Sequence, residues 1–462
     1  MASEKLSWRE KTGYALGDAG SNFYWKTFEF FLMFFYTDVF RLPAATTGTM
    51  FAVARIVDGI CDPIMGILAD RTNTRWGKFR PYLLWFAIPN AAAAVLTFTT
   101  PDLGGSSKTV YAYVTYTFMM IAYTAINIPY SALMGVMTPS SEDRTSLSSF
   151  RFVGAFTAGI VVIFFTKRLV AILGATPEQG WQLAMLVWGA IATLMFWGAF
   201  LSTRERVRPS ADQKTDLRAE LRDLAGNGPW MVLFALGVVV MTNFWIRSAT
   251  TVYYFNYVVR RPNLFEPFAL SGTVASVVGI MLTGPLTRRL GGKKRLYTAV
   301  MAVGSLLVAL FWIVPPDQIT LVFALNIATG IVMGPQAPLV WAMYADTADY
   351  SEWRTGRRAT GLIFAAATFS LKLGSAFAGW TTGQLLDRFG YAANQVQTAE
   401  SLRGIVFLMS IVPGALGLLA AATAVFYPLG DDRMRRVERE LETRRTSARA
   451  PIEVTALRGV RA

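Results

Sequence analysis

The sequence predicts an all-α membrane protein with about twelve transmembrane helices in two six-helix halves. Of its 462 residues, 53% are hydrophobic and only 16% are charged, whereas a soluble protein usually carries about 25% charged residues. Apolar stretches long enough to cross a bilayer recur along the chain. Because backbone polar groups in lipid must be satisfied within the segment, each stretch is expected to be a helix.

The expected spans follow one another along the chain, with boundaries good to a few residues. They are 14–39, 46–69, 81–100, 110–136, 150–173, 181–203, 230–258, 267–288, 296–315, 318–344, 359–386 and 403–427. We therefore expect an N-terminal six-helix bundle over 1–203, a central cytoplasmic loop over 204–229, a C-terminal six-helix bundle over 230–428 and a basic cytoplasmic tail over 429–462. The arginine-rich tail is expected to form a short amphipathic segment near anionic lipid, followed by disorder.

The net charge of +14 lies mostly in short links and in the tail. Links after even-numbered spans carry the larger share of Lys and Arg, including Arg71, Arg75, Lys78, Arg80, Arg288, Arg289, Lys293, Lys294, Arg295, Arg354, Arg357 and Arg358. Cytoplasmic loops carry such an excess, so both termini are expected in the cytoplasm. Lys167-Arg168 and Arg260-Arg261 are exceptions. Since the charge does not gather on one soluble domain, we expect membrane lipid and no nucleic acid as a partner.

Several chemistries are excluded by residues that the chain lacks. There is no histidine, and Cys61 is the single cysteine, so histidine-based catalysis, a histidine proton relay and an internal disulfide are ruled out. The sequence shows no nucleophile–base pair, no metal-ligand cluster and no phosphate-binding loop. We expect neither an enzyme nor a cofactor, and no obligate protein partner is evident.

Two short motifs recur between the halves. GILADR at 66–71 leads to GKFR at 77–80, and GPLTRR at 284–289 leads to GKKR at 292–295; SEDRT at 141–145 recurs as SEWRT at 351–355. The offsets of roughly 210–218 residues, at corresponding spans, indicate duplicated six-helix halves. Parallel halves of this kind build the major facilitator fold, in which the substrate site lies between them near the membrane midplane.

Two aspartates in the second span are the strongest functional signal. Asp58 and Asp62 are four residues apart, so they share one helix face. Carboxylates in hydrocarbon are costly by a few kcal/mol or more and usually face a cavity. We interpret the pair as a binding site for a cation that must also leave. The alternative is a permanent ion pair with Arg55 or another basic residue.

Polar residues in other spans are expected to line the same cavity. Span one carries Asp18, Asn22, Lys26 and Glu29 on one face, either as cavity lining or as an internal salt-bridge ladder. Span four offers Thr124 and Asn127 as neutral oxygen ligands or sugar hydrogen-bonding groups, or as contacts between helices. Candidate basic residues are Arg151, Arg247 and Lys372, and candidate sugar-stacking aromatics are Trp25, Tyr123, Tyr130, Trp245 and Trp341.

The repeated cytoplasmic motifs are expected to control conformational cycling rather than substrate affinity. Their basic residues can bind helix ends or acidic loop residues, with Glu142 and Glu352 as possible partners. The predicted gating residues are Arg75, Lys78, Arg80, Glu142, Arg144, Lys293, Arg295, Glu352 and Arg354.

The chain resembles the glycoside–pentoside–hexuronide:cation symporters, the group that includes melibiose permease. The motifs that carry the resemblance are FYTDV at 35–39, ARIVD at 54–58, DPIMG at 62–66, RWGKFRP at 75–81, NIPY at 127–130, ADTADY at 345–350 and KLGSAF at 372–377. The resemblance implies that Asp58, Asp62 and Thr124 bind the coupling cation. It also implies that Lys372 and Arg151 serve the central site.

The sequence departs from that family in three respects. The aspartates that hold sugar hydroxyls in melibiose permease become Asn22 and Asn127, a stacking tryptophan becomes Ser131, and the cation-site asparagine of sodium-coupled relatives becomes Cys61. The first two changes weaken any claim for melibiose. A thiol is a poor ligand for a hard cation, so the change to Cys61 weakens the claim for sodium as the coupling ion. Lys26 and Glu29 are also unusual for the family.

We therefore expect a symporter that imports a sugar or glycoside with a cation by alternating access, with H⁺ slightly favoured over Na⁺. A proton needs only a carboxylate in apolar surroundings, whereas sodium would also need backbone carbonyls or water as ligands. The expected location is a bacterial inner (cell) membrane. Two alternatives remain at this stage. One is a transporter of the same fold for a lysolipid or a drug, and the other is a non-transporting membrane receptor.

Overall fold

The structure is a computed structural model that describes residues 6–138, 141–206, 226–355 and 360–437, with isolated positions at 222, 224, 439–441 and 443. Most of the central loop and the end of the tail therefore lie outside the described residues. The elements of the first part are α1 (Trp8–Thr27), η1 (Phe28–Leu32), η2 (Phe35–Val39), α2 (Ala44–Arg71), α3 (Arg80–Trp85), α4 (Ala87–Thr97), α5 (Gly105–Met137), α6 (Ser141–Leu173) and α7 (Pro177–Ser202).

The remaining elements continue the helical pattern. They are α9 (Gly228–Tyr253), η3 (Tyr254–Val258), η4 (Pro262–Leu264), α10 (Phe265–Met281), α11 (Thr283–Arg289), α12 (Lys293–Ala309), η5 (Leu310–Trp312), α13 (Ile319–Met333), α14 (Gln336–Thr355), α15 (Thr360–Arg388), α16 (Ala399–Met409) and α17 (Ile411–Val425). Several expected spans are single runs of helix broken by a local turn, such as α3 with α4 and α16 with α17. Among the described residues, eight helices are long and apolar enough to cross a membrane.

Local sequence explains several helix ends and breaks. Ser7 and Glu10 form a reciprocal capping box at the start of α1, which satisfies backbone donors that the first turn leaves unpaired. Pro81 follows the first residue of α3, where its missing N–H costs nothing. Pro63 and Pro129 lie inside α2 and α5, where each removes a backbone donor close to the candidate site.

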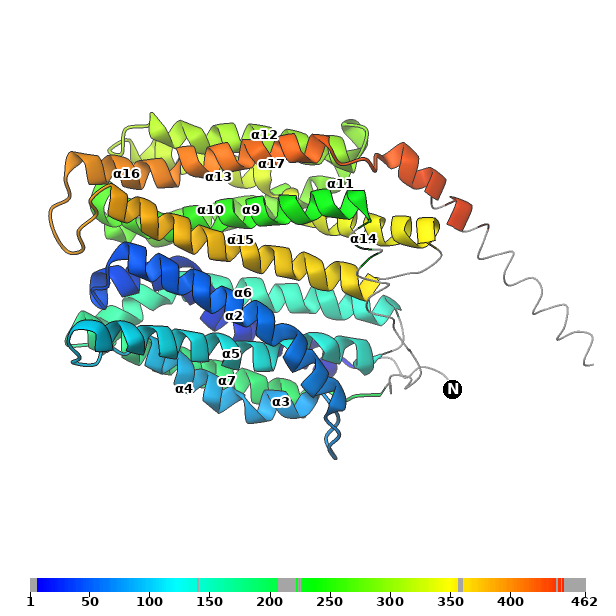
Figure 1. The fold of residues 1–462 in the computed structure, drawn as a ribbon, viewed down its shortest axis with the longest axis horizontal. Helices are drawn as coiled ribbons and strands as arrows, with labels where there is room; N and C mark the ends of the chain where they lie inside the picture. Colours follow the sequence, from blue (N-terminus) through cyan, green and yellow to red (C-terminus); the bar gives the residue numbers. More distant parts are fainter. Residues whose placement is uncertain are drawn as a thin grey trace, which may run out of the picture. The chain divides into compact units, whose positions relative to one another are not determined.

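The described helices form two compact units, of which the first comprises Met1–Gln213, Phe244–Leu270 and Ser375–Met409. In this unit α1 packs against α6 and α7, α2 against α5, and α4 against α5 and α7. Figure 1 shows the blue-to-green helices of this unit lying side by side. Its interior is rich in aromatic side chains: Phe35 lies 4.7 Å from Phe98, ring centroid to ring centroid, and Phe98 stacks on Trp181.

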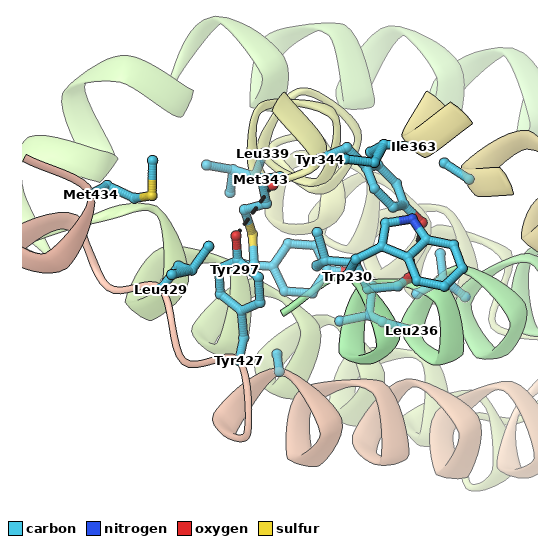
Figure 2. Close-up of a cluster of buried hydrophobic side chains, with 14 of the residues drawn as sticks. Trp230, Leu236, Tyr297, Leu339, Met343, Tyr344, Ile363, Tyr427, Leu429 and Met434 are labelled. Atoms are coloured by element: carbon cyan, nitrogen blue, oxygen red, sulfur yellow. Dashed lines mark hydrogen bonds between the residues drawn. The ribbon is translucent and has the colours of Figure 1, made fainter. Parts of the chain in front are cut away.

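The second unit comprises Lys214–Asn243, Ser271–Gly374 and Ser410–Ala462. Its core joins α9, α12, α14, α15 and α17 around Tyr297, Tyr344 and Tyr427, as Figure 2 shows. Two of these buried phenols have the hydrogen-bond partners expected of buried polar groups: the Tyr344 hydroxyl donates to the Leu233 carbonyl at 2.9 Å, and the Tyr427 hydroxyl donates to the Met343 carbonyl at 3.2 Å.

The start of the tail belongs to this second core. Residues 431–437 are helical, and Met434 and Val437 are buried against α12 and α14. This part of the expected amphipathic segment therefore uses its apolar face to cover protein. The segment beyond 443 lies outside the described residues, so its expected contact with lipid stays a prediction.

Candidate cation and substrate site

The two aspartates of α2 meet a threonine of α5. The Thr124 hydroxyl lies 2.5 Å from Asp58 Oδ1, to which it donates, and 3.2 Å from Asp62 Oδ1. Asp58 is 1% exposed and Thr124 is 2% exposed, whereas Asp62 is half-buried. A single hydroxyl proton cannot serve both carboxylates fully at once, and the three residues form a compact cluster of oxygen atoms.

Arg55 contributes to this cluster from one side. Its Nη1 lies 3.8 Å from Asp58 Oδ2, a long distance for an ion pair. The guanidinium lies beside two indoles that also contact each other: its carbon is 4.8 Å from the Trp25 ring centre and 5.4 Å from the Trp245 ring centre, and the two ring centres are 5.2 Å apart. Cation–π contacts of this kind are stronger away from water. Both the indoles and Asp58 therefore contribute to holding Arg55.

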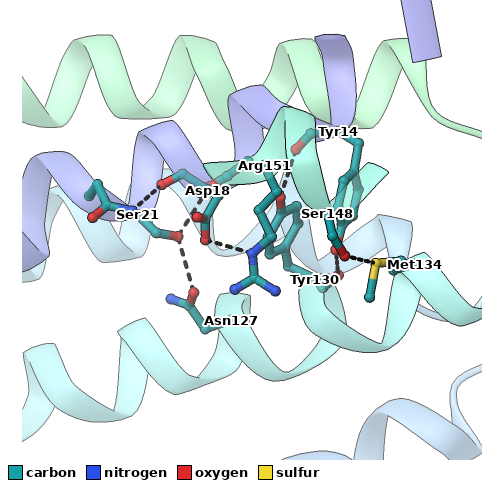
Figure 3. Close-up of polar contacts among 10 residues, drawn as sticks. Tyr14, Asp18, Ser21, Asn127, Tyr130, Met134, Ser148 and Arg151 are labelled. Carbon is teal, nitrogen blue, oxygen red and sulfur yellow. Dashed lines mark hydrogen bonds and ion pairs between the residues drawn. The ribbon is translucent and has the colours of Figure 1, made fainter. Parts of the chain in front are cut away.

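The polar face of α1 meets α5 and α6, as Figure 3 shows. Arg151 Nε on α6 lies 3.1 Å from Asp18 Oδ1, and its guanidinium lies 5.4 Å from the Tyr130 ring centre. Ser21 donates to Asn127 Oδ1 at 3.1 Å, and Asn127 Nδ2 donates to the Tyr123 carbonyl at 3.1 Å. These contacts fix the side chains that span one and span four present to each other.

The C-terminal part of the polar stripe of span one, which runs from α1 into η1, holds a second charged pair. Lys26 Nζ lies 2.7 Å from Glu29 Oε2; the lysine side chain is 26% exposed and the glutamate 1%. Ser248 donates to the other glutamate oxygen at 3.3 Å. Asn22 turns back on its own helix, donating to the Asp18 carbonyl at 2.8 Å. The stripe thus contains an internal ion pair, as expected for a salt-bridge ladder. It also contains a partly exposed lysine, as expected for residues that line a cavity.

A small cavity lies next to these groups within the first unit. Its volume is about 30 Å³, and its polar lining includes Glu29, Arg55, Tyr116, Ser375 and Thr382, with the indole of Trp245 beside them. Such a space admits a water molecule but not a drug-sized or sugar-sized ligand, whose pockets usually measure several hundred Å³.

The other candidate residues are placed as follows. The Trp25 and Tyr123 rings stack with centroids 5.8 Å apart, so both lie beside the Asp58 cluster. Cys61 lies on α2 one turn after Asp58 and is half-buried. Arg247 is on α9, and Lys372 is on α15 in the second unit. A role for Lys372 opposite the aspartates stays a prediction.

The first basic motif is organised by an acidic residue that the sequence analysis did not single out. Glu205, just after α7, accepts hydrogen bonds from the backbone N–H groups of Lys78, Phe79 and Arg80 at 2.9, 2.8 and 3.0 Å. A Cβ at Gly77, whose φ is 112°, would lie 2.5 Å from this carboxylate. The Arg80 side chain donates to the Phe200 carbonyl at 2.6 Å, near the end of α7. Arg75 covers the Trp76 ring at 4.6 Å.

The second motif repeats this arrangement in the second unit. Asp431, just after α17, accepts from the Lys293 N–H at 3.0 Å, and a Cβ at Gly292, whose φ is 131°, would lie 2.8 Å from it. The Lys293 ammonium pairs with Asp346. Arg295 follows on α12. In both halves an acid after the sixth span caps a glycine-led basic loop, a pattern detectable in sequence only by aligning the halves.

The remaining gating candidates are only partly described. Glu352 and Arg354 lie on α14, and Arg354 donates to the Gly226 carbonyl. The side chains of Glu142 and Arg144 lie outside the described residues. Glu10, at the start of α1, and Arg206, which directly follows Glu205, form an ion pair at 2.6 Å. The sequence analysis did not select either residue.

Comparison with known proteins decides the family. The model of a family described as MFS/sugar transport protein matches residues 13–431. The chain belongs to this family. It is therefore a membrane transporter of the major facilitator superfamily and not an enzyme, and its fold is the major facilitator fold.

Two relatives and one solved structure illustrate the similarity. The chain is 39% identical over 432 residues to the inner membrane symporter YicJ of Escherichia coli (strain K12), covering 92% of this chain and 93% of the relative. It is 35% identical over 435 residues to the isoprimeverose transporter of Lactiplantibacillus pentosus, covering 91% and 89%. The crystal structure of a D-xylose–proton symporter superposes with a TM-score of 0.65 at 16% identity, covering 91% and 96%, which supports the fold.

Proposed function

We propose that this family member imports a sugar or glycoside together with a cation, and that the cation binds at Asp58, Asp62 and Thr124. One observation carries the proposal: a threonine hydroxyl lies within hydrogen-bonding distance of two intramembrane carboxylates. Charged side chains in a membrane are costly and mark ion pathways. The relatives named a symporter and an isoprimeverose transporter support the same class of activity.

Coupling follows if the cation changes the stability of the closed, substrate-loaded state. The cluster lies beside Arg55 and the Trp25–Tyr123 stack, so neutralising its charge alters the aromatic wall that a sugar ring would contact. A ligand shifts a conformational equilibrium only through its different affinity for the two states. Sugar and cation then favour closure jointly, and each raises the affinity for the other by the same factor.

The proton is the favoured coupling ion. Three side-chain oxygens converge in the cluster, and Cys61 supplies sulfur where sodium-coupled relatives place an amide. The substrate contacts proposed are Asn22, Lys26, Asn127, Arg151 and Lys372, with Trp25 and Tyr123 as the stacking surface. The location proposed is a bacterial inner membrane with both termini in the cytoplasm, and the basic motifs are proposed to act in gating.

A competition panel tests the substrate class. Purified protein in vesicles is first offered a set of labelled saccharides. Monosaccharides, disaccharides, uronic sugars, lysolipids and amphipathic drugs then compete for the entry of any saccharide that accumulates. We expect saccharides to compete and the lipid and drug classes to leave uptake unchanged. Efficient competition by lysolipid or drug alone would overturn the assignment, and a protein that moves no solute would point to a receptor.

A further inference from the structure

Another buried carboxylate lies near the end of span one, outside the proposed cation cluster of α2 and α5. Asp38 in η2 is 4% exposed. Its carboxylate accepts hydrogen bonds from Thr37 at 2.6 Å, from Tyr391 at 2.6 Å to each oxygen, and from Tyr257. All of these donors are neutral hydroxyls. Burying a charge requires such partners, and nothing in the proposed transport chemistry uses this group.

The hydrogen bonds around Asp38 join three segments that are distant in sequence. Asn394, in the link after α15, donates from its side chain to the Asp38 carbonyl and from its backbone to the Tyr257 hydroxyl at 3.3 Å. The Tyr391 and Tyr257 hydroxyl oxygens lie 3.2 Å apart, and each hydroxyl donates to Asp38. We call Asp38, Tyr257, Tyr391 and Asn394 the latch. It connects the end of span one, the end of span seven and the link after span eleven, all within the first unit.

The latch lies at equivalent positions of the two halves. The sequence FYTDVFRLP at 35–43 corresponds to YFNYVVRRP at 254–262, and each begins with a five-residue π-helix, η2 and η3. Asp38 and its partner Tyr257 are 219 residues apart, which is also the offset between the two nonapeptides. Equivalent residues of a duplicated chain meet each other only near the axis that relates the duplicates. Single π-turns inside helices, moreover, occur frequently at functional sites.

The backbone around the latch is held in an unusual conformation. Arg41 has φ 62°, Arg260 has φ 55° and Asn394 has φ 58°; among the described residues, these are the non-glycine positions with positive φ. Arginine rarely adopts this region, and such residues persist where the surroundings enforce them, often in switch segments. Each arginine comes directly after a π-helix and its C-cap residue, so the backbone is strained at the same position in both halves.

The latch borders the larger of two cavities among the described residues of the first unit. This cavity, of about 610 Å³, is lined by Arg41, Asp387, Tyr391, Asn394 and Gln395, and we call it the vestibule. A smaller cavity, of about 30 Å³, has Met33 of span one and Ala249 of α9 in its wall. These two residues precede Asp38 and Tyr257 on the same two spans, so the small cavity lies further along the helices whose ends carry the latch.

We propose that the latch is the outer gate of the transporter, closed in this structure. The inference rests on the proposed alternating-access transport and on the cytoplasmic N-terminus: span one begins there, so its far end at Asp38 faces outward. Opening requires the phenol hydroxyls to leave the carboxylate and be replaced by water. Neutral donors make this exchange reversible, because no second buried charge is left unpaired when the gate opens.

The test measures access from outside to a reporter beneath the latch. Ala249→Cys places a small thiol on the wall of the 30 Å³ cavity. A membrane-impermeant methanethiosulfonate reagent is then added to right-side-out vesicles. The reaction of Cys61 is measured in protein without the reporter cysteine and subtracted. We expect Asp38→Asn and Tyr391→Phe each to raise the labelling rate by about tenfold, the effect of losing a hydrogen bond to a charged group. Tyr257→Phe, which removes one donor and little volume, serves as the variant least able to disturb folding.

Asp387→Asn is the matched control. It makes the same chemical change on an exposed residue of the vestibule rim, and we expect the parental labelling rate. Equal rates in the parent and in all three latch variants would overturn the proposal, as would increased labelling only in inside-out vesicles. The readout needs neither sugar nor an ion gradient, so a failure of the proposed substrate or ion leaves this result interpretable.

Discussion

Replacement of Glu205 by alanine is expected to destabilise the basic loop after α2 and the start of α3. The carboxylate receives three backbone N–H groups at 2.8–3.0 Å. Loss of one helix N-capping side chain costs about 0.5–2 kcal/mol. Because water can reach part of this half-buried loop, we take the sum for three donors as about 2–4 kcal/mol. Glu205→Gln keeps one oxygen acceptor and loses the charge, so about 1–2 kcal/mol is expected.

Thermal unfolding in detergent measures this loss. An unfolding entropy of about 2.1 cal/mol/K per residue gives a chain of 462 residues a shift of about 1 °C per kcal/mol, so a loss of about 2–4 kcal/mol lowers the unfolding midpoint by about 2–4 °C. Glu400→Gln is the control, since Glu400 is an exposed acid in the first turn of α16 and contributes only through the helix dipole, about 0.3–1 kcal/mol. An alanine variant that unfolds within a degree of the control would refute the capping role of Glu205.

Three further outcomes are expected. Thr124→Val should shift the cation concentration for half-maximal uptake by about 10–100-fold because a hydrogen bond to a charged group is lost, while Thr124→Ser should keep the parental value; equal values in both variants would contradict the bridging role. Lys372→Ala should impair binding and coupling, and Lys372→Arg should rescue poorly because a planar fork does not replace a compact ammonium; parental uptake in the alanine variant would make Lys372 a packing residue. Burial raises the pKa of Glu10, but contacts with Arg206 and Ser7 lower it more, to below its ordinary 4.5. A depressed carboxyl pKa stabilises the fold above the ordinary value, and the contribution is lost as pH falls through the folded pKa. Glu10→Gln should therefore flatten acid unfolding below about pH 4.5, and an unchanged acid profile would exclude this contribution.

The parts of the site that follow helix periodicity were accessible from sequence. Asp58 and Asp62 share a helix face because they are four residues apart, and the structure adds Thr124 of α5 as their common hydrogen-bond partner. The resemblance to symporters had named Thr124 in the same set. The family assignment is confirmed by the match over residues 13–431, as are the helical membrane fold and the transporter class.

Contacts between distant segments could not be read from periodicity. Glu205 accepts a hydrogen bond from the N–H of Phe79, which lies 126 residues earlier in the chain. No local sequence pattern indicates this contact. Asp38 was visible only as part of the FYTDV motif, because its partners Tyr257 and Tyr391 lie 219 and 353 residues away. Alignment of the two halves would have revealed both features, since the nonapeptides and the acids after the sixth spans recur.

The environment of Arg55 shows a different limit. Sequence places it one turn from Asp58 and suggests an ion pair, which the structure shows with the two groups 3.8 Å apart. The structure adds contacts of the guanidinium with the Trp25 and Trp245 rings. The balance between aromatic faces and a carboxylate depends on which helices pack around α2. That information is absent from the helix itself.

Uptake into vesicles under separate ion gradients is the decisive measurement. Parent and Asp58→Asn proteins are compared with a pH gradient in sodium-free medium and with a sodium gradient at fixed pH, using a sugar selected by the competition panel. We expect the parent to accumulate the sugar under the pH gradient, and Asp58→Asn to exchange sugar without accumulating it. Accumulation driven by sodium alone would contradict proton coupling, and parental accumulation by Asp58→Asn would remove the carboxylate from the coupling site.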